Sequence, residues 1–133
     1  MCAVGHELLR YRPEHYLEAL HQLGGRASLT ALARVVGVRP STARKMVLYL
    51  QAEGLVEYRG RGGVLLTEAG RARVEHLDRI HSSLADFFKA IGVEEELAES
   101  EAEKLEHVID PRVVERLAAV AQLLKSLKAL CGR

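Results

Sequence analysis

A short break between two helical patterns constrains the fold of this chain more than any other feature. Residues 30–36 and 40–52 both favour helices, and only three residues separate them. Gly37 allows a tight turn there, and Pro40 suits the first turn of a helix, where its missing N–H costs nothing. We therefore predict two short, closely packed helices, the first of them capped by Thr30.

Two extended runs follow these helices. VEYR at 56–59 and VLLT at 64–67 flank a Gly-Arg-Gly-Gly segment, which predicts a β-hairpin with a flexible, basic tip. Thr67 is expected to cap the next helix. The remaining helices are predicted at 13–23, 68–90, 94–108 and 111–130. The fold class is therefore mostly α with a small β-hairpin wing, as in a winged helix-turn-helix followed by a helical domain.

Charge is distributed unevenly along the chain, although the formal net charge is only +1. Residues 26–61 contain seven basic side chains and two acidic ones, whereas residues 94–106 contain seven glutamates and one lysine. The basic segment suits phosphate contact and the acidic segment suits cation binding. For most of the glutamates, a solvated helix face is the simpler interpretation.

The bulk properties are those of an ordinary intracellular chain. No stretch is long and apolar enough to span a bilayer, and no signal peptide opens the sequence, so we expect a cytoplasmic protein without membrane contact. Cys2 and Cys131 lie near the termini and are expected to be unpaired thiols. A chain of 133 residues can bury one good core, or two small ones joined by a long helix.

The predicted helix-turn-helix has the side chains that a DNA-reading helix needs. Short polar groups suit base edges and long basic groups suit phosphates, and both kinds occur near the start of the second helix. A single basic side chain is usually only solvated, but a cluster around this motif favours double-stranded DNA as a partner. The candidate DNA-binding residues are Arg39, Pro40, Ser41, Thr42, Arg44, Lys45, Arg59 and Arg61.

The last predicted helix suggests self-association. One helix-turn-helix reads only a short half-site, so specific binding usually requires a dimer on a palindromic operator. The helix has an apolar band that is wide enough to need a partner, and packing within the protomer accounts for part of it. The band consists of Val113, Val114, Leu117, Val120, Ala121, Leu124, Leu127 and Leu130. We expect a homodimer.

Histidines and glutamates recur at helical spacing in two places. His15 and Glu18 are separated by three residues, and Glu103, Glu106 and His107 stand at i, i+3 and i+4, so each set is expected on one helix face. Each residue alone is most simply a surface side chain. Together, imidazoles and carboxylates without a thiolate suit Mn²⁺, Fe²⁺, Co²⁺ or Zn²⁺.

The chain resembles a known family in several segments. The segments HYLEAL, VRPSTARKMVLYLQAEGLV, LLTEAG and EAEKLEHVID are similar to the iron/manganese-dependent repressors of the diphtheria-toxin-repressor family, most closely to its short manganese-transport-regulator branch. The resemblance covers almost the whole chain. It implies a DNA-binding domain at 1–72 and a metal-binding and dimerisation domain at 73–133. It also implies a metal-dependent repressor of metal-uptake and homeostasis genes.

The same resemblance implies a set of metal ligands. By position they are His15, Glu18, His81, Glu103, Glu106 and His107. Position 15 is His where the manganese branch has Asp and the iron branch has Met, while Glu103 agrees with the manganese branch, because the iron branch has Cys there. We expect Mn²⁺ first, with Fe²⁺ or Zn²⁺ as alternatives, since imidazole favours borderline metals over Mn²⁺.

The ligands implied by the resemblance fall in both predicted domains. An ion bound between them would fix the separation of the two reading helices in a dimer. One alternative is a winged-helix regulator gated by an organic ligand or a protein partner, without metal. We predict that the protein is not an enzyme, because the sequence offers no nucleophile–base pairing and no glycine-rich phosphate cradle.

Overall fold

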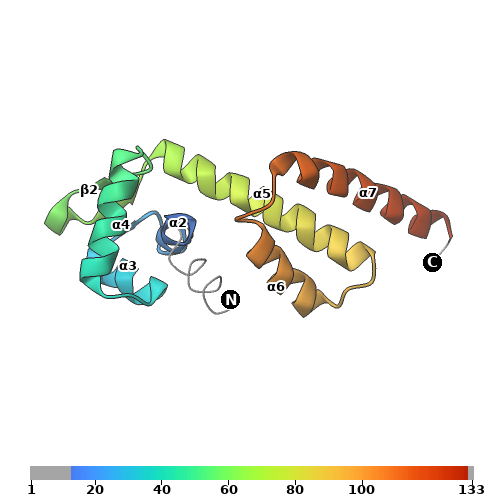
Figure 1. The fold of residues 1–133 in the computed structure, drawn as a ribbon, viewed down its shortest axis with the longest axis horizontal. Coiled ribbons are helices and arrows are strands. Elements are labelled where there is room, and N and C mark those ends of the chain that lie inside the picture. Colours follow the sequence, from blue (N-terminus) through green and yellow to red (C-terminus); the bar gives the residue numbers. More distant parts are fainter. Residues whose placement is uncertain (1–12, 132–133) are drawn as a thin grey trace. The chain divides into compact units, whose positions relative to one another are not determined.

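The computed structural model describes residues 13–131, which fall into two compact units (Figure 1). The first unit ends at Glu75 and the second begins at His76, so the boundary lies within helix α5 (Glu68–Ala90). The structure is mostly helical with one small sheet, which confirms the predicted fold class. Among these residues, no helix combines the length and the apolar character needed to cross a membrane.

The first unit contains a helix-turn-helix. Helix α3 (Leu29–Val36) ends at Gly37, whose φ of 90° is left-handed and whose N–H donates to the carbonyl of Ala33 at 2.8 Å. Glycine adopts this conformation without the steric cost of a Cβ. Helix α4 (Pro40–Ala52) begins three residues later, with proline in its first turn. The predicted tight turn is confirmed.

The cap of helix α3 differs from the sequence prediction. Ser28, and not Thr30, is the N-cap, because its hydroxyl oxygen accepts the backbone N–H of Ala31 at 3.1 Å. The N-cap therefore lies two residues earlier than predicted, which places Thr30 inside the first turn. The predicted Thr67 cap is correct, since its hydroxyl oxygen accepts the N–H of Gly70 at 3.1 Å.

The sheet has three antiparallel strands in the order β1-β3-β2. Strands β2 (Val56–Tyr58) and β3 (Val64–Leu66) form the predicted hairpin, while β1 (Arg26–Ala27) was not predicted. A short 3₁₀ turn, η1 (Gly60–Gly62), connects β2 to β3. At Gly63, φ is 92° and a Cβ would meet the carbonyl oxygen of Ala27 at 2.8 Å, so glycine allows β3 to approach β1.

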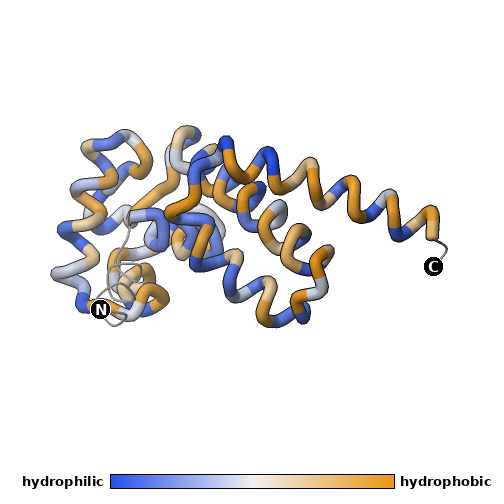
Figure 2. Tube along the Cα trace, turned by 45° about the vertical axis from the view of Figure 1, so that its right-hand side comes forward, coloured by the Kyte–Doolittle hydropathy of each residue, from blue (hydrophilic) through white to orange (hydrophobic). Residues whose placement is uncertain are grey.

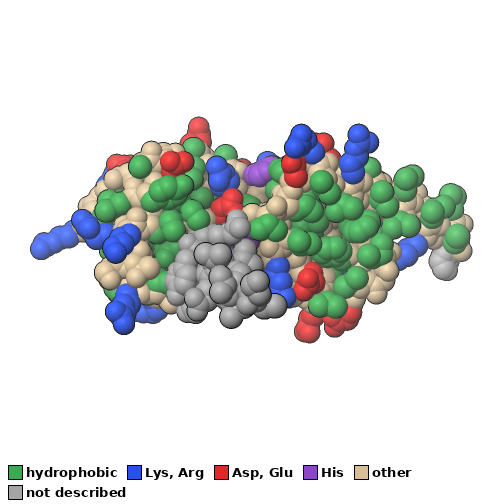
Figure 3. Space-filling model, in the orientation of Figure 1, with side chains coloured by type: hydrophobic (Ala, Val, Ile, Leu, Met, Phe, Trp, Pro, Cys, Tyr) green, Lys and Arg blue, Asp and Glu red, His purple; other side chains and the backbone are tan. Residues whose placement is uncertain are grey.

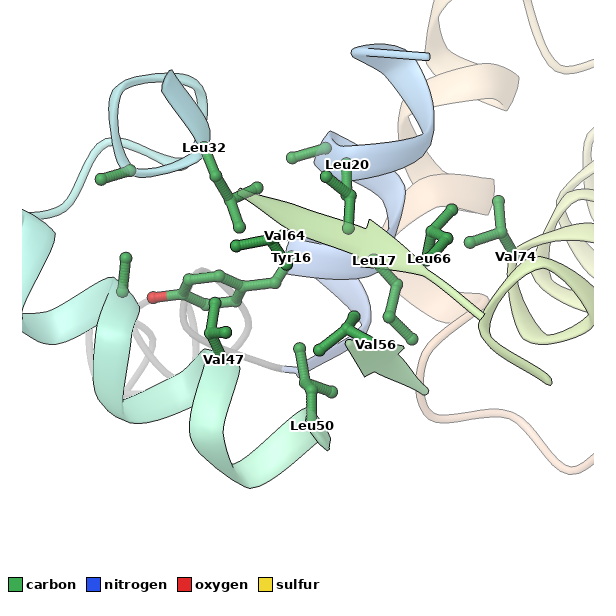
Figure 4. Close-up of a cluster of buried hydrophobic side chains, with 13 residues drawn as sticks. Tyr16, Leu17, Leu20, Leu32, Val47, Leu50, Val56, Val64, Leu66 and Val74 are labelled. Carbon is green, nitrogen blue, oxygen red and sulfur yellow. The ribbon is translucent and has the colours of Figure 1, made fainter. Parts of the chain in front are cut away.

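One hydrophobic core holds the first unit together. Helix α2 (Pro13–Gln22) directs its buried face into it, and α3, α4, the sheet and the start of α5 supply the rest (Figure 4). The largest members of this first core are Tyr16, Leu17, Leu20, Leu32, Val47, Leu50, Val56, Val64, Leu66 and Val74. Helix α4, which the sequence predicts to read DNA, is thus anchored in a well-packed core.

The second unit consists of the later part of α5, α6 (Glu95–Leu105) and α7 (Pro111–Leu130). Its buried cluster is small and comprises Ile80, Leu84, Ala85, Ala102 and Val114. Hydrophobic residues recur along the whole of α7 (Figure 2), and several large ones are exposed: Val113, Val120, Leu123, Leu127 and Leu130.

Helix α6 ends earlier than predicted. It stops at Leu105 instead of continuing to Val108, with Glu106 as its C-cap. The chain then turns toward Asp110, which has an extended backbone and caps α7 by accepting the N–H of Arg112 at 2.8 Å. His107 therefore lies in a turn and not on the helix.

Candidate metal centre and DNA-reading surface

Helix α2 contributes one predicted ligand pair. His15 and Glu18 are both half-buried, and one ligand atom of each lies within 4.8 Å of the other. Their neighbours Tyr16 and Leu17 are anchored in the first core, which fixes the rotation of the helix. The structure thus confirms that these two side chains share a face, as the i, i+3 spacing predicted.

The second unit brings three predicted ligands into one chain of contacts. The Nδ1 of His81 on α5 lies 2.7 Å from Oε1 of Glu106, and Oε2 of Glu106 lies 3.5 Å from Nε2 of His107. Glu106 is buried, whereas Glu103, one turn earlier on α6, is exposed. A buried carboxylate between two imidazoles is a donor set that suits a divalent transition metal.

His81 has a second carboxylate partner that sequence reasoning missed. Its Nε2 lies 2.7 Å from Oε1 of Glu99, and the other oxygen of Glu99 accepts from Nζ of Lys89 at 2.7 Å. Burial of the ring, the largest single influence, lowers the pKa of His81, but the hydrogen bonds to Glu99 and Glu106 outweigh it and raise the pKa. Lys89 and His81 together lower the pKa of Glu99.

A signal for Glu99 was present in the sequence. It precedes Glu106 by seven residues, which is two helical turns, so the two carboxylates share a face of α6. Lys89 follows His81 by eight residues on α5. Glu99 had been interpreted as part of the solvated acidic face, because nothing in the sequence showed which face of α6 packs on α5.

The side chains expected to read DNA are exposed. Arg39, Pro40, Ser41, Thr42, Arg44 and Lys45 all lie at the start of α4, and Arg59 and Arg61 lie in the wing. Lys and Arg side chains stand out from the surface of the first unit (Figure 3). Arg59 is held by Glu57, whose carboxylate accepts from Nε at 2.9 Å and from Nη2 at 3.2 Å.

Comparison with known proteins gives the class of this chain. Residues 9–64 match the N-terminal DNA-binding domain of the iron dependent repressors, and residues 67–126 match their metal binding and dimerisation domain. The chain is 30% identical to the HTH-type transcriptional regulator MntR of Lysinibacillus sphaericus over 115 residues, which are 84% of this chain and 83% of that protein.

Two solved structures also match this chain. The structure of ScaR with bound Zn²⁺ matches 84% of this chain at 32% identity and a TM-score of 0.73. A manganese-dependent transcriptional repressor in complex with manganese matches 84% at 29% identity and a TM-score of 0.69. This chain spans 54% and 53% of those two longer chains.

Fold and comparisons together define a metal-dependent, DNA-binding transcriptional regulator. The chain belongs to the iron-dependent repressor family. The predicted function class, a divalent metal as cofactor, DNA and a second copy as partners, and the absence of an enzymatic role are thereby confirmed. The membership favours metal over an organic ligand as the regulating signal.

Proposed function

We propose that this protein represses genes for metal-ion uptake and homeostasis by binding a palindromic operator in the cytoplasm as a homodimer. Mn²⁺ or a similar divalent ion activates it. The observation that supports the proposal most directly is the contact chain from His81 through the buried Glu106 to His107. We favour Mn²⁺ over other divalent ions as the activating metal because one of the matching solved structures is a manganese-dependent repressor.

The proposed ligands are His15, Glu18, His81, Glu103, Glu106 and His107. Once bound, the ion supplies the positive charge that lets these carboxylates converge without mutual repulsion. Two of the proposed ligands belong to the first unit and four to the second. The metal then acts by shifting the population toward the DNA-competent arrangement.

The proposed domain at residues 1–72 binds DNA, and the proposed domain at residues 73–133 binds the metal and forms the dimer. In the first domain, Ser41 and Thr42 reach base edges, while Arg39, Arg44 and Lys45 contact phosphates. Arg61 and Arg59 contact the neighbouring backbone from the wing. For Arg59 this requires release from Glu57, which holds its guanidinium by two hydrogen bonds.

Operator binding with and without metal tests this function. DNA selected from a pool of random-sequence duplexes in the presence of Mn²⁺ provides the labelled operator. We expect a palindromic sequence whose affinity rises about 5- to 150-fold between excess chelator and saturating Mn²⁺, the usual range of coupling between two sites. The variants E106A and H107A should lose this response, because Glu106 and His107 are proposed ligands that contact each other.

The matched control is E96A, which removes an exposed carboxylate from the same helix as Glu103. It should leave the response to Mn²⁺ unchanged. Equal operator affinity with chelator and with saturating Mn²⁺, Fe²⁺ or Zn²⁺ would show that the proposal is wrong. If E106A and H107A both keep the metal-dependent gain in operator affinity, the assignment of these residues as ligands is wrong, while the proposed function still stands.

A further inference from the structure

Two carboxylates hold the ring of His81 from opposite sides. Glu106 lies 2.7 Å from Nδ1 and Glu99 lies 2.7 Å from Nε2. Glu99 lies on α6 and Glu106 is the C-cap of that helix, two turns later, while the ring comes from α5. Because the two nitrogens are on different edges of the imidazole, the two contacts together fix both the position and the rotation of the ring.

The contacts of Glu99 disfavour a bound cation. One oxygen of Glu99 is committed to His81, and the other accepts from Nζ of Lys89 at 2.7 Å. A positive ion at Glu99 would lie beside the ammonium group and would be repelled by it. The Glu106 side differs, because the second oxygen of Glu106 lies near another imidazole, that of His107.

We propose that Glu99 is a positioning residue of the metal centre: it accepts the Nε2–H of His81, holds the ring, and leaves Nδ1 on the Glu106 side for the ion. Metal-binding histidines commonly donate their second N–H to a carboxylate, which selects the tautomer and makes the ligating nitrogen more basic. Lys89 keeps the carboxylate of Glu99 in place. This inference rests on the proposed ligand roles of His81 and Glu106.

Dissociation constants for Mn²⁺ and Co²⁺, measured on the full chain by competition with a chelating indicator dye, test the proposal. E99A should weaken binding about 10-fold, at the lower end of the range for such partners, because Glu99 is partly exposed. E99Q should lie between E99A and the wild type, since its amide oxygen still accepts the Nε2–H. E96A on the same helix should bind as the wild type does.

Spectroscopy separates positioning from ligation. At saturating Co²⁺ the visible absorption bands of E99A should match those of the wild type, because the ligands stay the same. In the metal-free protein, the ¹⁵N shifts of the His81 ring should change in E99A and much less in E99Q. Shifted Co²⁺ bands would make Glu99 a ligand and overturn the proposal, and so would unchanged affinity in E99A.

H81A distinguishes failure of this inference from failure of the ligand assignment. If H81A loses affinity and E99A does not, only the positioning role is wrong. If H81A also binds Co²⁺ normally, the ligand role of His81 is wrong and the inference fails with it. Should E99A not fold, as judged by circular dichroism, the near-isosteric E99Q decides: weaker binding than the wild type supports the proposal and equal binding overturns it.

Discussion

The two units of this protein differ in how much of their apolar surface they bury by themselves. The first unit places large side chains from α2, α3, α4, the sheet and α5 in a shared core. The second unit has a smaller buried cluster, and Leu123, Leu127 and Leu130 of α7 are exposed. Hydrophobic side chains also gather on the visible face of this unit (Figure 3). The exposed apolar face of α7 is therefore the surface where we expect the second copy to pack.

The polar side chains expected to be functional are also distributed differently between the two units. In the first unit, the side chains expected to read DNA point into solvent. In the second unit, Glu106 is buried in contact with His81. A buried carboxylate needs a compensating partner, so we expect the stability of the second unit to depend on protons and cations more than that of the first. This contrast agrees with the family match, which places DNA binding in the first part of the chain and metal binding in the second.

Truncating the first core should give the largest effect. L17A should reduce the free energy of unfolding of the first unit by about 2–5 kcal/mol, because it leaves a cavity in a packed core. Tyrosine fluorescence reports this unit alone, since the four tyrosines lie at positions 11, 16, 49 and 58 and the chain has no tryptophan. L48A, exposed on α4, is the control and should cost roughly 0.5 kcal/mol or less.

A charge on the exposed face of α7 should affect assembly and leave the first unit intact. L127D would place an unpaired carboxylate in the proposed dimer interface, at a cost of about 3 kcal/mol, which corresponds to a roughly 100-fold weaker dimer. Sedimentation should show protomers, while the tyrosine-detected unfolding stays unchanged. Q122D, exposed on the same helix but away from Leu127, should remain dimeric. A dimer of normal stability in L127D would place the interface elsewhere.

Features that neighbouring residues specify could be predicted from the sequence, whereas features that depend on distant contacts could not. Helix α4 has the predicted bounds, because proline and an apolar pattern specify it locally. Strand β1 was missed, since its two residues become a strand only by pairing with β3, which is distant in sequence. Ser28 was overlooked as a cap because Ser28 and Thr30 are both suitable capping residues by type.

For the candidate metal centre, the sequence suggested residues but not the contacts between them. Spacing suggested Glu106 and the family resemblance suggested His81, and the structure places these two side chains in contact. The roles of Glu99 and Lys89 depend on which face of α6 packs against α5, and the many glutamates on α6 conceal that face. The end of α6 before His107 is set by the turn into α7, another feature of packing.

Acidification should act on the second unit in two opposite ways. The pKa of His81 is raised in the metal-free protein, so its imidazolium stabilises that state fully below the unfolded pKa, and this stability is lost as the pH rises through the folded pKa. Metal binding requires the neutral ring. The dissociation constant for Mn²⁺ should therefore rise up to about tenfold for each pH unit below the pKa of His81. Dye competition across this range measures it, and a pH-independent constant would contradict it.

Changing the proposed ligand His15 should give a smaller effect, confined to metal preference. His15 stands where the manganese-transport-regulator branch is expected to have Asp, and imidazole favours borderline ions. H15D should therefore raise the affinity for Mn²⁺ relative to Zn²⁺, by on the order of several-fold, since one ligand of the set changes from nitrogen to oxygen. The ratio of the two dissociation constants is the measurement. H21D on the exposed face of the same helix is the control. An unchanged ratio in H15D would mean that helix α2 holds the first core together without selecting the metal.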